Sequence, residues 1–194
     1  MKKKSEAKYQ KIIDETVKLI AENGIAELST TKVAKRAGIV QSNIYIYFKD
    51  KQDLIKNVYL NQVTKMSIYL NQKVDDEAPL KEKLIRYIEA LYVFSMAYPI
   101  IITAIERIKE APSVQLIVRE NENGDQNQKI QQLLKQGISV GLLRNTHISI
   151  LLSIVFSTIK NYSRSIQNKV YSSEEVPLSD VIEMIMAAIL KPTG

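Results

Sequence analysis

Four polar side chains able to hydrogen-bond with nucleic-acid bases lie in one short segment. They are Gln41, Ser42, Asn43 and Tyr45. Glutamine and asparagine amides can pair with base edges, notably those of adenine, while serine and tyrosine hydroxyls suit phosphates or bases. In a helix, Ile44 and Phe48 are one turn apart and would face inward, which leaves the polar groups outward. The segment therefore has the chemistry of a surface that recognises nucleic acid.

The sequence offers little for catalysis or metal binding. It contains no cysteine, so a disulfide, a thiol nucleophile and a cysteine-ligated metal are all excluded. His147 is the only histidine, and we expect it to be a surface or capping residue rather than a metal ligand. There is no glycine-rich phosphate loop, no nucleophile elbow and no helical pair of acids at catalytic spacing. We expect no enzymatic activity, no cofactor and no metal.

The positive charge is unevenly distributed along the chain. Residues 1–61 hold 12 Lys and Arg against 7 Asp and Glu, whereas residues 62–194 hold 15 against 14. Almost the whole net charge of +6 therefore lies in the first third of the chain. Such a distribution favours an N-terminal domain that binds a polyanion, because cations that displace counterions from phosphates supply much of the affinity for nucleic acid. The alternative is a solvated basic face without a partner.

Short helices separated by glycine must position the polar segment. Apolar residues recur at spacings of three and four from Tyr9 to Ala21, which predicts an amphipathic helix that ends at Gly24. A second short helix is expected over Thr31–Ala37, with Gly38 at its end.

The polar segment Gln41–Phe48 follows, as a third short element. Ser29 or Thr30 offers an oxygen to cap the second helix, and Asp50 caps a long helix that runs to about Val74. Two short helices separated by a glycine turn and followed by another helix indicate a helix-turn-helix.

The remaining chain also reads as helical, because no strand-like alternation bounded by turns occurs after about residue 78. The sequence therefore predicts an all-α protein of about nine helices. The expected organisation is an N-terminal three-helix helix-turn-helix domain followed by a larger helical domain. No secretion signal is expected, and the longest uncharged runs are shorter than the roughly 20 residues of a membrane-spanning helix. We expect a cytoplasmic protein.

The segment Thr30–Leu54 closely resembles the DNA-binding signature of the tetracycline-repressor (TetR) family. Both have a threonine pair, an alanine-glycine turn, tyrosine-x-tyrosine-phenylalanine and lysine-x-x-leucine, in that order. The resemblance implies that Thr31, Tyr47 and Lys51 touch phosphates. The full set of expected DNA-binding residues is Thr31, Gln41, Ser42, Asn43, Tyr45, Tyr47, Lys49 and Lys51.

Two positions depart from the pattern of the family. Val40 stands where many members have a serine, so the usual cap of the recognition helix is either missing or moved to Ser42. The pair Ser42-Asn43 stands where glycine-threonine or serine-threonine is common. The second departure concerns the DNA sequence that is recognised, rather than the fold.

The resemblance also implies two functional domains. Residues 1–50 would bind DNA, and residues 51–194 would bind a ligand and form a homodimer. Apolar stripes run along the two last expected helices, His147–Ile166 and Leu178–Leu190. In the family, such helices from two subunits pack as a four-helix bundle. The alternative is that the stripes belong to a core within one chain.

Aromatic and methionine side chains are concentrated in Tyr87–Glu106, which would suit a cavity for an apolar or amphipathic molecule. In the family, a bound ligand moves the DNA-binding domains of the two subunits, here called the heads, apart and lowers their affinity for DNA. The alternative is that these side chains are ordinary core. The candidate ligand-binding residues are Tyr92, Phe94, Met96, Glu106, Arg107, Phe156 and Asn161.

Together these features predict a sequence-specific transcriptional regulator. In the leading hypothesis, a homodimer represses at a pseudo-palindromic operator in double-stranded DNA and is released by a small-molecule effector. A helical carrier or enzyme acting on the same molecule is one alternative, and a DNA-binding protein without a ligand is another. The sequence leaves open the operator, the effector, the regulated genes, the number of dimers per operator, and whether the effector releases or promotes DNA binding.

Overall fold

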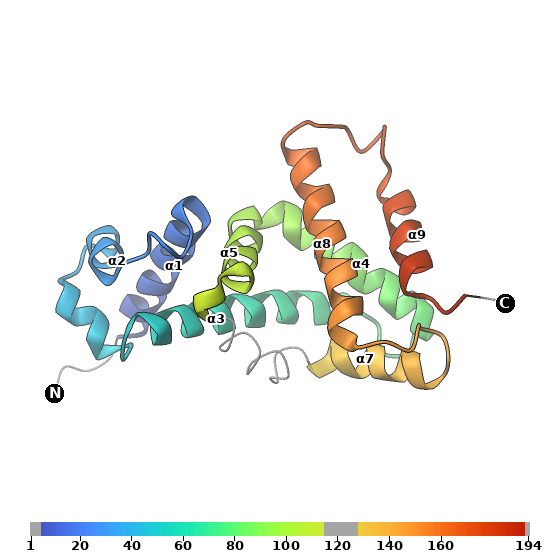
Figure 1. Ribbon diagram of the computed structural model, residues 1–194, viewed down its shortest axis with the longest axis horizontal. Coiled ribbons are helices and arrows are strands. Elements are labelled where there is room, and N and C mark those ends of the chain that lie inside the picture. The colour runs from blue at the N-terminus through green and yellow to red at the C-terminus, as the bar shows by residue number, and fades with distance from the viewer. Residues whose placement is uncertain (1–4, 115–127, 193–194) are drawn as a thin grey trace. The chain divides into compact units, whose positions relative to one another are not determined.

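The computed structural model describes residues 5–114 and 128–192, and most of these residues are helical (Figure 1). The α-helices are α1 (Glu6–Asn23), α2 (Thr30–Ala37), α3 (Lys51–Asn71), α4 (Leu80–Ala97), α5 (Pro99–Glu110), α7 (Gln128–Ser139), α8 (Ile148–Gln167) and α9 (Leu178–Ile189). Two 3-10 helices are η1 (Gln41–Ile46) and η2 (Pro112–Val114). Within the described ranges, extended pairing is limited to one isolated bridge, between Leu143 and Leu190. The prediction of an all-α fold is confirmed.

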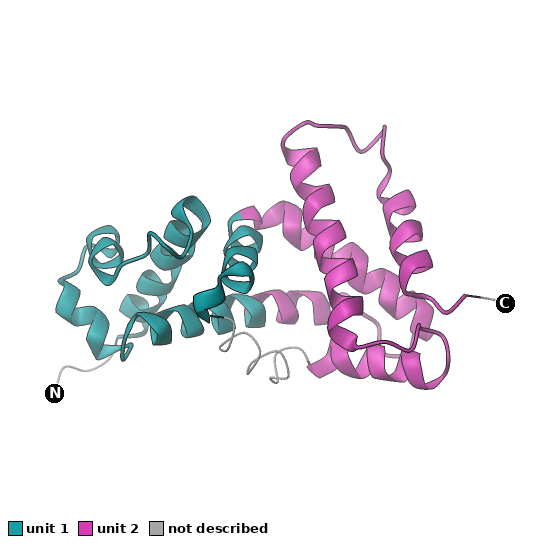
Figure 2. Ribbon diagram, in the orientation of Figure 1, with its two compact units in different colours: residues 1–64, 100–124 teal, residues 65–99, 125–194 magenta. Residues whose placement is uncertain are grey.

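The chain forms two compact units, coloured separately in Figure 2. Unit 1 comprises residues 1–64 and 100–124, and unit 2 comprises residues 65–99 and 125–194. The boundary expected from the sequence, between residues 50 and 51, falls where α3 begins. Unit 1 therefore contains the helix-turn-helix segment, the first part of α3 and nearly all of α5.

Glycines end the first two helices of unit 1, as predicted. Gly24 and Gly38 have φ angles of 78° and 65°, a region that side chains with a Cβ rarely adopt. The Gly24 amide donates to the Ile20 carbonyl at 2.9 Å, and the Arg107 guanidinium of α5 donates to the same oxygen at 3.3 Å. The end of α1 is thus tied to a helix far away in the sequence.

Side-chain caps begin the helices on either side of the polar segment. The Ser29 hydroxyl accepts the Lys32 amide at 3.2 Å, so Ser29 rather than Thr30 caps α2. The Asp50 carboxylate accepts the Asp53 amide at 2.8 Å and caps α3, as predicted. These caps fix where the two helices begin.

The elements α1, α2, η1, α3 and α5 of unit 1 all contribute buried apolar side chains. Ile44 and Phe48 are 0% and 1% exposed. The other fully or nearly fully buried side chains of this core include Ile12, Ile13, Ile20, Val33, Ala37, Leu54, Ile55, Ala104, Ile105 and Ile108.

In unit 2, α4 packs against α8, α9 and α7. The Tyr87 hydroxyl donates to the Asn71 side chain at 2.9 Å, and burial raises the pKa of Tyr87 to about 12. The Tyr162 hydroxyl donates to the Val176 carbonyl at 2.7 Å. His147 caps α8 by accepting the Ser149 amide, which confirms the capping role predicted for this histidine.

The loop between α7 and α8 holds the end of α9. The Arg144 amide donates to the Ile189 carbonyl at 2.9 Å, and its guanidinium donates to the Ala188 carbonyl at 2.7 Å. Buried Leu143 lies so close to Gly137 of α7 that a Cβ there would be 2.6 Å from Leu143 Cδ1. Any side chain at position 137 would therefore force Leu143 to shift.

Among the described residues, no single helix is both long and apolar enough to cross a membrane. Only α4 and α5 taken together, which are bent sharply at Pro99, reach that length and composition.

We expect Gly137→Ala to destabilise the protein by about 1–3 kcal/mol, because the added methyl group displaces a buried leucine in a packed site. Urea unfolding followed by circular dichroism measures this change. Lys135→Ala, at an exposed position of the same helix, is the control and should change stability by less than about 0.5 kcal/mol. Equal stability of the two variants would show that Leu143 does not require the glycine.

We expect Ile44→Ala to destabilise unit 1 by about 2–5 kcal/mol, because it leaves a cavity beneath the polar segment. Val40→Ala removes apolar atoms from a neighbouring side chain that is 69% exposed, and should cost less than about 0.5 kcal/mol. Amide hydrogen exchange of residues 30–58 localises the change to this unit. Similar protection in both variants would contradict the role given to Ile44.

Candidate nucleic-acid interface

The polar segment forms a 3-10 helix, η1, held by apolar side chains on its inner side. Ile44 is buried within η1, and Phe48 is buried just after it. The ring of Tyr9, on α1, stacks on Phe48 with centroids 5.4 Å apart. Burial is the leading cause that raises the pKa of Tyr9. The inner side of η1 is therefore fixed to the rest of unit 1.

No side chain caps the start of η1. Val40 occupies the N-cap position, and its side chain has no oxygen to accept a hydrogen bond. Ser42 does not take over this role. Of the two outcomes left open by the sequence, the missing cap is the one found. The first bond of η1 is instead made by the backbone, from the Asn43 amide to the Val40 carbonyl at 2.9 Å.

The outer side of η1 presents polar groups. Gln41 and Ser42 are exposed, Tyr45 is 52% exposed and Asn43 is half-buried. The structure thus brings all four candidate base-reading residues onto one short element. It leaves their roles toward DNA as a proposal.

One residue that the sequence did not single out for DNA binding joins this group. The Thr30 hydroxyl, at the start of α2, accepts a hydrogen bond from Gln41 Nε2 at 3.0 Å. The same hydroxyl lies 3.2 Å from the Tyr45 hydroxyl. The sequence had offered Thr30 only as a cap for α2. Because 11 and 15 residues separate it from these partners, spacing along the chain gave no signal of the contact.

The candidate phosphate-binding residues lie around η1 in different environments. Thr31 and Lys49 are exposed. The Tyr47 hydroxyl accepts the Ser5 amide at 3.0 Å, which leaves its own proton free to donate. Lys51 is half-buried and its ammonium donates to the Ile25 carbonyl at 3.3 Å.

Several cations of unit 1 are paired with acids. Arg36 contacts Glu15 at 3.2 Å and also forms an ion pair with Glu22. Lys32 pairs with Glu27 at 2.9 Å. Hydrogen bonds from Lys18 and then from Arg36 lower the pKa of Glu15, and those from Arg36 lower the pKa of Glu22. Part of the basic charge of the head is therefore neutralised within the head itself.

The candidate ligand-binding residues fall into both units. Tyr92, Phe94 and Met96 lie on α4, and Phe156 and Asn161 lie on α8, which packs against α4. Glu106 and Arg107 lie on α5 in unit 1. The structure does not establish a single site that contains all seven.

Aromatic contacts surround the α4 candidates. Phe94 is fully buried, and its ring lies 5.4 Å from that of Tyr69 and 4.8 Å from that of Tyr98. The rings of Tyr92 and Tyr162 are 5.4 Å apart. Phe94 is therefore part of the core of unit 2, as the alternative reading of these aromatic side chains allowed.

A buried polar group on α8 was missed by the sequence analysis. Ser163 is 2% exposed, and its hydroxyl has no hydrogen-bond partner among the described residues. Buried polar groups usually have a partner, since leaving one unpaired costs free energy. Nothing in the sequence distinguished this serine from the exposed serines of the same helix.

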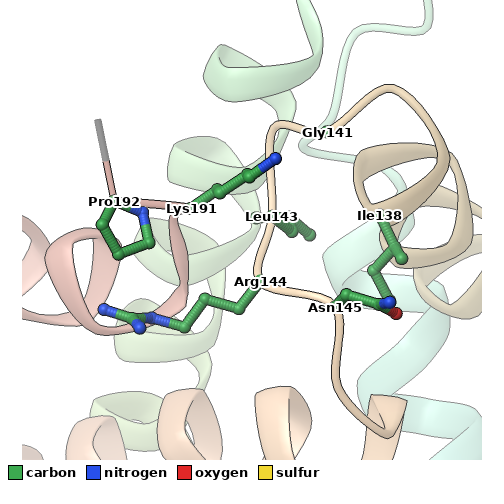
Figure 3. A pocket seen from close by; sticks show the side chains of 7 residues that line it. All are labelled: Ile138, Gly141, Leu143, Arg144, Asn145, Lys191 and Pro192. Atoms are coloured by element: carbon green, nitrogen blue, oxygen red, sulfur yellow. The ribbon is translucent and has the colours of Figure 1, made fainter. Parts of the chain in front are cut away.

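A surface hollow of about 470 Å³ lies beside the loop that holds α9 (Figure 3). Its cations are Arg144 and Lys191, and its apolar lining includes Leu143 and Pro192. Arg144 already bonds the last carbonyls of α9, where a cation is favoured by the helix dipole. The position of the Arg144 charge is thus explained by helix capping. Among the described residues, no group of three or more acids or histidines is placed to hold a metal.

Known proteins share both the head and the whole fold. Residues 12–58 match the family model of bacterial regulatory proteins of the tetR family. A fatty acid metabolism regulator protein of Bacillus subtilis is 35% identical over 82 residues, which make up 42% of this chain and 42% of that protein.

Two crystal structures extend the likeness to the full length. A proposed transcription regulator from Lactobacillus plantarum is 31% identical, with a TM-score of 0.77 over 95% of this chain and 99% of that chain. The FadR transcriptional regulator of Bacillus subtilis, in complex with stearoyl-CoA, has the same fold. Its TM-score is 0.72 at 22% identity, over 93% of this chain and 99% of that chain.

Three observations indicate the same family: the signature in residues 30–54, the short helices that end at glycines around the buried inner side of η1, and the likeness to these known proteins. The chain belongs to the tetR family of bacterial regulatory proteins and is a DNA-binding transcriptional regulator.

Proposed function

We propose that the protein is a repressor, which binds a pseudo-palindromic operator as a homodimer and leaves it when an amphipathic small molecule binds. The observation that carries this proposal is η1, whose polar residues face outward while Ile44 and Phe48 are buried beneath them. A carrier or an enzyme would have no use for such a surface. The proposal assigns no catalysed reaction to the chain and places it in the cytoplasm, with the chromosome.

In this proposal, residues 1–50 contact DNA and residues 51–194 sense the effector and dimerise. Gln41, Ser42, Asn43 and Tyr45 read base edges in the major groove. Four further residues bind the backbone phosphates and set the position of the head without choosing the sequence. These are Thr31, Tyr47, Lys49 and Lys51.

We assign dimerisation to α8 and α9, on the sides that remain exposed. The stripe Val181, Ile182, Ile185, Met186 and Ile189, expected from the sequence to face a partner, is buried within unit 2 of a single chain. Exposed apolar side chains remain at Ile150, which is 51% exposed, and at Met184, which is 59% exposed. Ala187 and Ala188 are exposed beside Met184 and would let a partner helix approach closely. Two copies related by a twofold axis would then present two heads to two half-sites.

We assign effector binding to the layer formed by α4 and α8. Tyr92, Met96 and Phe156 are only partly buried there, and Asn161 is exposed. The unpaired Ser163 hydroxyl on α8 offers a polar anchor. Long-chain acyl-CoA is the effector class that we favour, because one relative regulates fatty acid metabolism and another binds stearoyl-CoA. Glu106 and Arg107 are proposed to pass the change to the head, since Arg107 bonds the end of α1.

Fluorescence anisotropy with labelled DNA from the upstream region of the gene itself tests the proposal. The protein should bind this DNA more tightly than a scrambled duplex, and stearoyl-CoA should weaken binding roughly 5- to 150-fold, the usual range of coupling between two sites. Coenzyme A alone should have little effect, because it lacks the acyl chain.

Other outcomes of the same titration separate the alternatives. Binding of stearoyl-CoA without any binding of DNA would support a carrier or an enzyme. Sequence-specific DNA binding that no acyl-CoA alters would remove the effector part of the proposal. Tighter DNA binding in the presence of stearoyl-CoA would show that the effector promotes DNA binding instead of releasing the protein.

We expect Lys49→Ala to weaken binding to all duplexes alike and to lower the slope of log Kd against log salt by about one, because one phosphate contact is lost. Lys135→Ala makes the same change of charge in unit 2 and should leave the slope unaltered. A loss confined to the operator sequence would contradict the phosphate role of Lys49.

A further inference from the structure

We infer that Thr30 is a positioning residue for base recognition: its hydroxyl holds Gln41 and Tyr45 in the orientation that reads an adenine. This inference rests on the proposed function and goes beyond it, because Thr30 itself need not touch DNA. It concerns three exposed or half-buried side chains from two elements, α2 and η1.

The Thr30 hydroxyl is free for this role because Ser29 caps α2. The Lys32 amide bonds the Ser29 hydroxyl at 3.2 Å, which leaves Thr30 Oγ1 to accept from Gln41 Nε2 at 3.0 Å. The 3.2 Å contact with the Tyr45 hydroxyl then joins the start and the end of η1 through one atom.

With these hydrogen bonds made, Gln41 and Tyr45 still have donors and acceptors available for DNA. After donating one proton to Thr30, the Gln41 amide keeps its second N–H and its carbonyl oxygen. On its major-groove edge, adenine presents an acceptor, N7, and a donor, N6–H. The remaining Gln41 N–H can donate to N7, and the Gln41 carbonyl oxygen can accept from N6–H. If Thr30 donates its own proton to the Tyr45 oxygen, the phenol proton remains available to an acceptor on DNA.

Gln41 depends on this support because its side chain is exposed. Gln41 is the first residue of a short 3-10 helix whose N-cap, Val40, has no hydrogen-bonding side chain. An exposed glutamine at such a place would otherwise sample many rotamers. Restricting a flexible side chain before binding avoids an ordering cost that corresponds to roughly a two- to tenfold change in affinity.

Thr30→Val and Thr30→Ser test the inference in the full-length protein. Valine keeps the shape and removes the hydroxyl, whereas serine keeps the hydroxyl. We expect Thr30→Val to weaken operator binding roughly two- to tenfold and to reduce the penalty for replacing adenine in the half-site, with unchanged binding to scrambled DNA. Thr30→Ser should stay within about twofold of the unaltered protein. Thermal unfolding of both variants checks that the head remains folded.

A double-mutant cycle separates positioning from direct contact. In a background that carries Gln41→Ala and Tyr45→Phe, Thr30→Val should have no further effect, because the groups that it orients are gone. Additive losses would overturn the inference, and so would equal operator binding by the valine variant and the unaltered protein.

A measurement without DNA distinguishes failure of this inference from failure of the proposed function. NMR relaxation should show that the Gln41 side-chain amide has restricted motion in the free protein. The amide should become more mobile in Thr30→Val and not in Thr30→Ser. Equal mobility in all three proteins overturns the positioning role, whether or not DNA binds. Restricted motion in a protein that binds no duplex overturns the proposed repressor function and, with it, the assignment of Thr30 to base recognition.

Discussion

The structure of the head depends on the burial of Ile44 and Phe48 beneath a segment that is polar on its other side. A six-residue 3-10 helix has poor hydrogen-bond geometry and little stability of its own. Its orientation therefore comes from apolar side chains fixed in a core that α1, α2, α3 and α5 build. The polar outer side contributes little to folding, which leaves its side chains available for the base recognition proposed above.

Much of this architecture could be predicted from the sequence, because local signals and burial agree. Gly24 and Gly38 mark helix ends, Asp50 marks a helix start, and the spacing of Ile44 and Phe48 marks the inner side of η1. These features depend on neighbours within a few residues, where spacing determines geometry. The family signature adds the DNA-binding role, since it fixes residue types over this same local stretch.

The features that were not predictable depend on contacts between distant parts of the chain. Nothing in the spacing of Thr30 and Tyr45 shows that their hydroxyls lie 3.2 Å apart. The unpaired hydroxyl of Ser163 likewise depends on how α8 packs, and the packing of unit 2 also decides which side of α9 is covered. The seven ligand candidates were selected by residue type alone. That criterion does not separate core aromatics such as Phe94 from side chains beside a cavity.

The covered stripe of α9 has a consequence for how the protein is made. In many obligate dimers, apolar helix faces stay open until a partner arrives, so that folding and assembly are one event. Here Val181, Ile185 and Ile189 are already buried by the chain's own helices, with the loop at Arg144 fastening the end of α9. Under the dimerisation proposed above, this stripe would be covered before a partner arrives. Pairing of two chains would then be a separate step from completion of the core, and the concentration of the protein would affect how many pairs form.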